Sequence, residues 1–238
     1  MKAPPLVALA LLCLAPAAAA EPPSLFRILP DRSEIRILVY RAGLLSGLGH
    51  NHVIAGRGIN GGIELGTTIE ESSFDFAFPV ISLQVDHPRL RRLEGDDFPS
   101  DIPAKDIAAT RKNMLGSKLL DAEQFPRIRL VSQSVSGALP EVEISALVSV
   151  RDQTFPLDLV ATVAIDGEEL TATGELQMSH AEIGLKPFSA GFGALKVARE
   201  FTVKFEIVAV RKMFDGTHAA NVHLPFLMTT TSRALTRH

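Results

Sequence analysis

Strict alternation of apolar and polar residues is the feature of this sequence that most restricts its fold. Between residues 142 and 209 it recurs in successive segments, in which every second residue is apolar or glycine and most residues between are polar. A period of two predicts β-strands with one buried face, whereas a buried helix would repeat every 3.6 residues. The repeating positions are Val142, Ile144, Ala146, Val148 and Val150; Leu157, Leu159, Ala161, Val163 and Ile165; Leu170, Ala172, Gly174, Leu176 and Met178; and Phe201, Val203, Phe205, Ile207 and Ala209.

Further strands are expected earlier in the chain. Residues 34–41 and 72–85 alternate in the same way, and shorter patterns lie near Ile63 and Ile128. The apolar positions of the two longer segments are Ile35, Ile37 and Val39, and Phe74, Phe76 and Phe78. Together these make about eight strands that are polar on one face, which favours antiparallel pairing with that face in water.

Short turns connect several of the expected strands. Residues 137–140, 152–153 and 166–168 each separate two alternating segments, and the last carries the Asp-Gly sequence typical of hairpins. Consecutive hairpins form a meander, and a meander of this length removes its exposed edges by closing. We therefore expect an all-β protein, an antiparallel eight-stranded barrel.

Residues 86–126 interrupt the alternation with charged residues, glycine and proline. Pro103 suits the first turn of a helix, Asp101 is a candidate cap, and Gly116 is a candidate stop. We expect one short helix, residues 103–115, within this long loop, with Ile107, Met114 and Leu115 toward the barrel. Long loops are often functional, so the segment is either a lid or a solvated connection that plugs the barrel end.

The N-terminus has the features of an export signal. Lys2 precedes an apolar run at residues 6–15, and small residues end at Ala20. We expect residues 1–20 to be a signal peptide, a periplasmic or secreted protein, no integral membrane span after cleavage, and a flexible tail at residues 213–238. Cleavage removes the single cysteine, Cys13, which excludes disulfides and thiolate chemistry from the mature chain. With a net charge of −3 and no basic cluster, we expect no nucleic-acid partner.

The histidines of Gly49-His-Asn-His52 form the most distinctive local motif. On a strand, His50 and His52 would share a face, and neutral imidazoles bind Zn²⁺, Cu²⁺ or Ni²⁺. His180 shares parity with Met178 and is a candidate third ligand. The alternatives are a contact with a ligand headgroup at the barrel mouth, or hydrogen bonds to loop backbone around a bend. We assign no metal site here, and keep a metal-binding protein or metal-dependent enzyme centred on His50 and His52 as the alternative function.

Catalytic motifs give little support to an enzyme. The sequence has no Gly-x-Ser-x-Gly elbow and no paired-carboxylate motif. Glu94-Gly-Asp-Asp97 is acidic but lacks the spacing of a calcium loop. We therefore expect a binding protein with no catalytic residues and no cofactor.

Four local segments, in their order and spacing, resemble the YceI-like family of polyisoprenoid-binding proteins. They are residues 26–33, with the sequence FRILPDRS; residues 121–130, DAEQFPRIRL; residues 147–156, LVSVRDQTFP; and residues 184–197, GLKPFSAGFGALKV. The resemblance covers roughly residues 24–210, so residues 21–212 are expected to be one YceI-like β-barrel domain. It implies a lipocalin-like barrel that holds an isoprenoid or similar amphiphilic lipid in an apolar tunnel.

The residues suggest how such a ligand would bind. Small inward positions such as Ala161, Ala172 and Gly174 would leave room beside larger side chains, although the same alternation also describes a filled core. Each buried CH₂ group contributes about 0.8 kcal/mol, so a long chain needs no hydrogen bond to bind. The expected ligand-binding residues are Ile37, Val39, His50, His52, Phe74, Phe76, Phe78, Ala146, Val148, Leu159, Ala161, Ala172, Leu176 and Phe205. The oligomeric state is not predicted.

Overall fold

The computed structural model describes residues 23–190 and 195–212. The expected signal peptide, residues 1–20, and the expected flexible tail, residues 213–238, lie outside the described residues. Within the described part of the chain, no helix is long and apolar enough to cross a membrane.

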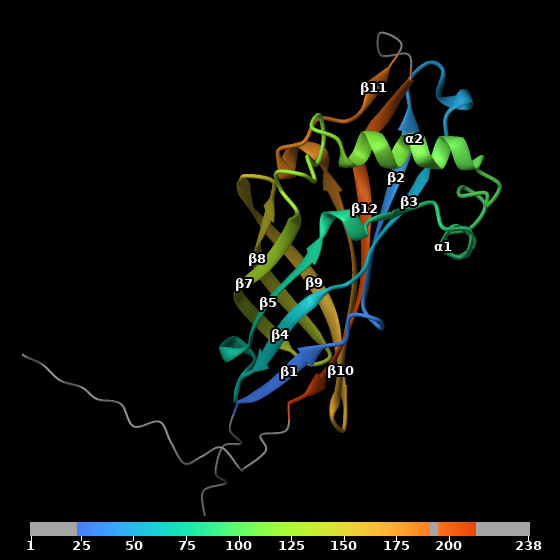
Figure 1. The fold of residues 1–238 in the computed structure, drawn as a ribbon. Helices are drawn as coiled ribbons and strands as arrows, with labels where there is room; N and C mark the ends of the chain where they lie inside the picture. Colours follow the sequence, from blue (N-terminus) through green and yellow to red (C-terminus); the bar gives the residue numbers. More distant parts are fainter. Residues whose placement is uncertain (1–22, 191–194, 213–238) are drawn as a thin grey trace, which may run out of the picture.

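The C-terminal half is the up-and-down meander that the alternation predicts (Figure 1). Its turns fall where the sequence places them, after Ala138, Val150 and Asp166. Each strand pairs antiparallel with the one before it in the ring. The strands are β7 Arg127–Ala138, β8 Glu141–Val150, β9 Gln153–Asp166, β10 Glu169–Ser179 and β12 Leu195–Arg211, with the short β11 Ser189–Ala190 pairing beside β12.

The N-terminal half supplies strands that are each broken into two pieces. The pieces are β1 Ser24–Ile28 and β2 Glu34–Ala42, β3 His52–Gly56 and β4 Asn60–Leu65, and β5 Ser73–Pro79 and β6 Gln84–Val85. Between β1 and β2 the side chain of the buried Ser33 replaces backbone pairing with β12. Its hydroxyl donates to the Val208 carbonyl at 3.2 Å and accepts from the Val208 N–H at 3.0 Å. The single strand expected over residues 72–85 is wrong: Pro79 ends β5, and the 3₁₀ turn η3 Val80–Ser82 precedes β6.

Strand β12 closes the barrel. Its seventeen residues pair with β10 along one side, and with β2 and then β1 along the other. The resulting closed ring has eight strands in the order β1-β4-β5-β7-β8-β9-β10-β12, while β2, β3 and β6 continue the wall beside β12, where β2 pairs from Lys196 to Glu206. The expected antiparallel eight-stranded barrel is confirmed.

The seam between β9 and β10 is not hydrogen-bonded along its whole length. The ladder between β9 and β10 ends at the pair Thr162–Thr173, although both strands continue toward the end of the barrel that carries α2. Beyond that pair the 3₁₀ turn η4 His180–Ile183 contacts both strands. Gly184, which follows η4, packs so closely on Phe155 of β9 that a β-carbon there would lie 2.5 Å from its ring. At this end of the barrel the turn η4 therefore occupies the position where β9 and β10 would otherwise pair.

Helix α2 (Ala104–Leu115) lies across one end of the barrel (Figure 1). The expected helix over residues 103–115 is confirmed, with Gly116 at its C-cap, but Asp101 as the cap is wrong, because Pro103 takes the N-cap position and no side chain caps it. Met114 is buried in the core, and Ile107 and Leu115 pack against it, as expected. A second helix, α1 (Pro88–Leu93), was not predicted. The remaining 3₁₀ turns are η1 Ser46–Leu48 and η2 Ile69–Glu71.

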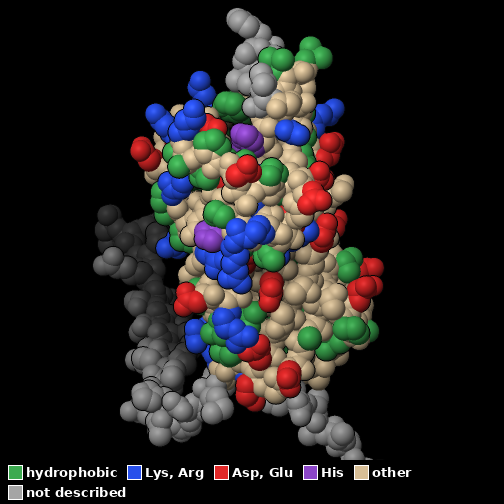
Figure 2. All heavy atoms as spheres, turned by 90° about the vertical axis from the view of Figure 1, so that its right-hand side faces the viewer, with side chains coloured by type: hydrophobic (Ala, Val, Ile, Leu, Met, Phe, Trp, Pro, Cys, Tyr) green, Lys and Arg blue, Asp and Glu red, His purple; other side chains and the backbone are tan. Residues whose placement is uncertain are grey.

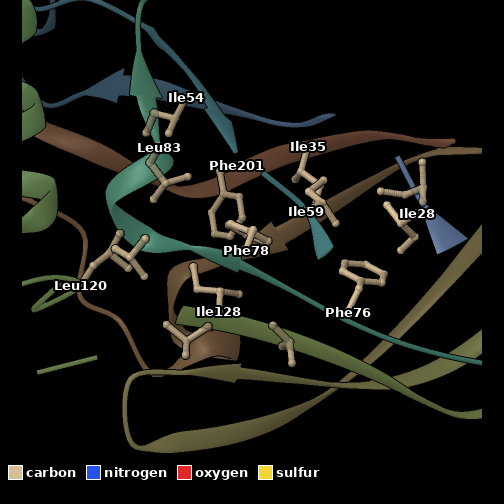
Figure 3. Close-up of a cluster of buried hydrophobic side chains, with 14 of the residues drawn as sticks. Ile28, Ile35, Ile54, Ile59, Phe76, Phe78, Leu83, Leu120, Ile128 and Phe201 are labelled. Carbon is tan, nitrogen blue, oxygen red and sulfur yellow. The ribbon is translucent and has the colours of Figure 1, made fainter. Parts of the chain in front are cut away.

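The main core lies inside the barrel and is built from the alternating positions (Figure 3). Figure 3 shows Phe76 and Phe78 from β5 and Phe201 from β12 projecting into this interior. Gly174 is needed here because the Phe205 ring covers it: a β-carbon at Gly174 would lie 2.4 Å from that ring. A separate apolar cluster on the outer face of β2 and β3 holds the loop of α1, through Leu38, Val53, Ala55, Leu90 and Phe98.

Candidate functional site

An apolar cavity of about 170 Å³ lies inside the barrel. Residues from seven of the barrel strands, from β2 and from η4 line it, and all of them are Ile, Leu, Val, Phe, Met or Ala. Their side chains point inward because successive strand residues face opposite sides of a sheet. The alternating faces therefore converge on a space that is only partly filled.

Most of the residues expected to bind a ligand line this cavity. They are Ile37, Phe74, Phe76, Phe78, Val148, Leu159, Ala161, Ala172, Leu176 and Phe205. Val39 and Ala146 are buried, 8 % and 1 % exposed, but do not line the cavity. Neither His50 nor His52 lines it. Whether any of these residues contacts a ligand stays a prediction.

Other lining residues escaped the prediction. Ile35, Val203 and Ile207 are among the alternating apolar positions of the sequence, but they were not included in the expected ligand-binding residues. Ile183 belongs to the turn η4, where no strand periodicity exists to indicate its direction. The sequence therefore shows which strand faces are internal, but not which turns fold over them.

The chemistry of the cavity is defined by its lack of polar lining side chains. An uncompensated hydroxyl or amide in such a space loses several kcal/mol of hydration, and a charge loses more. Hydrocarbon suffers no such penalty and gains about 0.8 kcal/mol per CH₂ group. The site can hold an alkyl or alkenyl group, but it excludes the polar end of an amphiphile from its interior.

The size of the cavity limits how much hydrocarbon it accepts without rearrangement. An apolar cavity of about 150 Å³ in another protein stays dry and accepts benzene. The cavity here is of similar volume, so it matches a group of about six carbons. Phe74 and Phe76 are stacked, with ring centroids 5.3 Å apart, on its wall. A longer chain must extend past the cavity or displace such side chains.

The histidine motif belongs to a different structure, a polar network outside the cavity lining. His52 lies on β3, and its Nδ1–H donates to Oδ2 of Asp86 at 2.6 Å. The other oxygen of this buried carboxylate accepts the Val53 N–H at 2.9 Å and a hydrogen bond from Nη1 of Arg91. Asp86 has a φ of 54°, so its backbone is in the left-handed region. The carboxylate joins β3, the turn after β6 and α1.

Arg91 is the centre of this network and is fully buried. Its Nε donates to the Pro99 carbonyl and its Nη1 to the Asn51 carbonyl, both at 2.6 Å. The guanidinium also lies 5.8 Å from the centroid of the Phe98 ring. Arg91 therefore ties the loop after α1 to the histidine motif. The sequence analysis missed this role, because Arg91 meets these partners only after folding.

The pKa of Asp86 is lowered, and the direction reflects opposing effects. Burial by itself raises the pKa of this carboxyl, since it penalises the charged form. The hydrogen bond and positive charge of His52, the Val53 N–H and the Arg91 guanidinium favour the carboxylate and outweigh burial. The charged form of Asp86 is thus part of the folded structure.

Glu94 makes a second anchor for the α1 loop. Its buried carboxylate accepts from Nη1 of Arg36 at 2.5 Å and from Nζ of Lys204 at 2.7 Å. Arg36 and Lys204 project from β2 and β12, where they pair across the ladder. Glu94 belongs to the acidic Glu94–Asp97 segment, and its role here is structural.

The other histidines do not join His52 in a metal site. His50 precedes β3, and its Nε2 lies 3.8 Å from Oδ2 of Asp106 on α2. His180 begins η4, where its Nδ1–H donates to the Arg199 carbonyl at 3.0 Å and its ring meets the edge of Phe201. Among residues 23–190 and 195–212, no group of three or more His, Cys, Asp or Glu side chains is placed to hold a metal ion.

Comparison with known proteins agrees with this architecture. The model of the YceI-like domain matches residues 26–209. The crystal structure of Burkholderia cenocepacia BcnA is similar in fold, with a TM-score of 0.57 at 15 % identity, over 77 % of this chain and 99 % of that one. A Campylobacter jejuni YCEI protein gives a TM-score of 0.48 at 7 % identity, over 68 % of this chain and 85 % of that one. Curated protein sequences give no significant match. Since the domain model covers most of its length, the chain belongs to the YceI-like family.

Proposed function

We propose that this protein binds an amphiphilic lipid, with an isoprenoid as the expected class, by taking the hydrocarbon end of the molecule into the barrel. The observation that supports this most directly is the uniformly apolar lining of the cavity. The YceI-like fold, known for polyisoprenoid binding, agrees with it. The polar end of the ligand stays outside the lining, because no side chain within it offers a hydrogen bond.

The cavity volume gives the proposal a magnitude. About six carbons fit without rearrangement, and at about 0.8 kcal/mol each they supply about 5 kcal/mol of favourable transfer energy. Association costs reduce this figure. A group of this size alone therefore binds weakly, and tighter binding needs the rest of a longer chain to find apolar contacts beyond the cavity. The unpaired part of the seam between β9 and β10 adjoins the cavity, since Leu176 of β10 and Ile183 of η4 both line it, and we propose that the chain extends in this direction.

A chain-length series tests the proposal. Straight-chain alcohols of increasing length are titrated into the purified protein by calorimetry, and affinity is expected to rise about fourfold per carbon until the cavity is full. An isoprenoid alcohol and a straight-chain alcohol of equal carbon number are then compared, with tighter binding expected for the isoprenoid. Affinity that does not depend on chain length would reject a hydrocarbon site in the barrel.

Native mass spectrometry supplies an independent test. Protein purified from cells under mild conditions is expected to carry a lipid that organic extraction releases. When this lipid is added back to protein loaded with alcohol, it is expected to displace the alcohol. The same spectra report the N-terminus. We propose an exported protein, periplasmic or secreted, whose chain begins at Glu21 after removal of residues 1–20.

A further inference from the structure

Large exposed apolar side chains gather at the tip of the barrel where β2 ends and β12 begins. Leu44 is 97 % exposed, and Leu45 and Phe188 are each 46 % exposed. Leu44 and Leu45 follow β2, and Phe188 immediately precedes β11. Figure 2 shows hydrophobic side chains at this end of the molecule. The other large exposed apolar residues in the described part of the chain lie apart from one another in sequence, Ile81 in η3, Leu93 in α1, Leu139 between β7 and β8, and Val160 in β9.

Strand pairing brings the backbone segments that carry these three residues to the same end of the barrel. The first residues of β12 pair with the end of β2, as Lys196 with Ala42 and Val197 with Arg41. On its other side β12 pairs with β11, and the Val197 N–H donates to the Phe188 carbonyl at 2.9 Å. Neighbouring strands lie about 4.8 Å apart. Phe188 and the end of β2 are thus separated by the width of one intervening strand.

The charge around these side chains is positive. Residues 41–49 and 184–199 contain Arg41, Lys186, Lys196 and Arg199 but no Asp or Glu, in a chain whose net charge is −3. Glu182, at the border, is exposed, and its carboxylate caps η4 by accepting the Ser179 N–H at 2.5 Å. Arg41, Lys186 and Lys196 are exposed. Arg41 also donates to the Gly49 carbonyl at 2.9 Å, while its guanidinium stays exposed. Apolar side chains with exposed cations beside them match a surface that has anionic groups above hydrocarbon.

The segment from Ile183 to Phe188 connects the tip to the cavity. Ile183 lines the cavity, Leu185 packs against the core, and Phe188 is exposed. The segment also follows directly on η4, which fills the open part of the β9–β10 seam. Phe188 is therefore only a few residues along the chain from the wall of the cavity.

We propose that this tip, defined as Leu44, Leu45 and Phe188 with Arg41, Lys186 and Lys196, docks on the surface of an anionic lipid membrane. The three apolar side chains enter the boundary of the acyl chains, and the three cations contact lipid phosphates. The interaction is reversible, because it buries few side chains and inserts no helix. It goes beyond the proposed function and does not require a ligand in the cavity.

Vesicle sedimentation tests the docking. The exported protein, with its N-terminus identified by mass spectrometry, is mixed with vesicles of phosphatidylcholine alone or with about one third phosphatidylglycerol. We expect at least tenfold tighter binding to the anionic vesicles, weakened by added salt. The variant K186Q/K196Q is expected to lose about fivefold for each lysine removed. Leu139→Ser, at the opposite end of the barrel, serves as the control and is expected to bind as the wild type does.

A fluorescence reporter places the contact on the molecule. The sequence has no tryptophan, so Phe188→Trp introduces a single one at the tip. Its emission is expected to shift to the blue when anionic vesicles are added. Val160→Trp, at a position 48 % exposed on the outer face of β9, is expected to show no shift.

The triple variant L44S/L45S/F188S completes the experiment. It is expected to bind anionic vesicles at least tenfold more weakly, with an unchanged melting temperature and unchanged alcohol affinity, because its altered side chains are exposed and outside the cavity. Equal binding of wild-type protein to neutral and anionic vesicles would overturn the proposal. So would wild-type binding by both the triple variant and K186Q/K196Q. Failure of alcohol binding with vesicle binding intact would count against the proposed function alone.

Discussion

Filling the cavity from the side of β10 gives the sharpest test of the barrel as a binding site. Ala172 lines the cavity, and Ala172→Leu adds three carbons to it. At about 30 Å³ for a group the size of water, these carbons occupy about 90 Å³, more than half of the 170 Å³ present. A ligand loses room for about three carbons. At about 0.8 kcal/mol each, the loss is about 2.4 kcal/mol, or about 60-fold in Kd.

The same substitution is expected to stabilise the protein without ligand. The new side chain buries its carbons in existing space, which adds up to about 2 kcal/mol to the free energy of unfolding. Melting temperature, followed by circular dichroism, should therefore rise by about 2 to 6 °C. Affinity for geraniol, a short isoprenoid alcohol, should fall in the same protein.

Ala164→Leu is the matched control, since it adds the same carbons on the exposed outer face of β9. It is expected to leave geraniol affinity unchanged. If Ala172→Leu binds geraniol as well as the wild type does, the ligand lies elsewhere. If affinity and melting temperature fall together, the substitution has damaged the fold and the cavity is not free space.

Three other predictions concern the buried network and the close packing of the barrel. Asp86→Asn is expected to lower the free energy of unfolding in urea by about 3 to 5 kcal/mol, because Arg91 stays buried without its charged partner, whereas the exposed Asp96→Asn should change it little. The partners of Asp86 lower its folded pKa despite burial. The stabilisation from this carboxylate is therefore complete at a pH above its unfolded pKa of about 3.9, and it is lost as the pH falls through the folded pKa. Acid unfolding curves should show this dependence in the wild type, and a wild-type slope matching that of Asp86→Asn would contradict it. Gly174→Ala is expected to destabilise by about 1 to 3 kcal/mol, because its β-carbon would lie 2.4 Å from the Phe205 ring, and an unchanged denaturation midpoint would show that the ring moves freely.

Alternation predicts the parts of this fold that are long strands uninterrupted along the chain. In β8, β10 and β12 the parity of Val148, Leu176 and Phe205 indicates the inner face, and all three line the cavity. The breaks in the N-terminal strands leave a weaker trace. Pro79 marked one of them, but the alternation on both sides of it favoured a continuous strand.

The polar network was less accessible to sequence reasoning, because its members meet only after folding. His52 and Asp86 are 34 residues apart and hydrogen-bond across the end of β3. The motif around His50 suggested ligands, whereas the carboxylates that meet its two imidazoles come from the turn after β6 and from α2. The volume of the cavity was likewise beyond prediction, since it depends on how the rings of residues such as Phe74 and Phe76 pack, and not on which face they occupy.

The closure of the ring by β12 has a consequence for how the protein is made. Until residues 195–211 are available, one edge of β10 and one edge of each of β1 and β2 lack the strand with which they pair in the folded barrel. A nascent or truncated chain is then an open sheet with two free borders, which are templates for pairing with other chains. Chains that stop before β12 are expected to aggregate or be degraded, and we expect the barrel to close only after β12 has been synthesised.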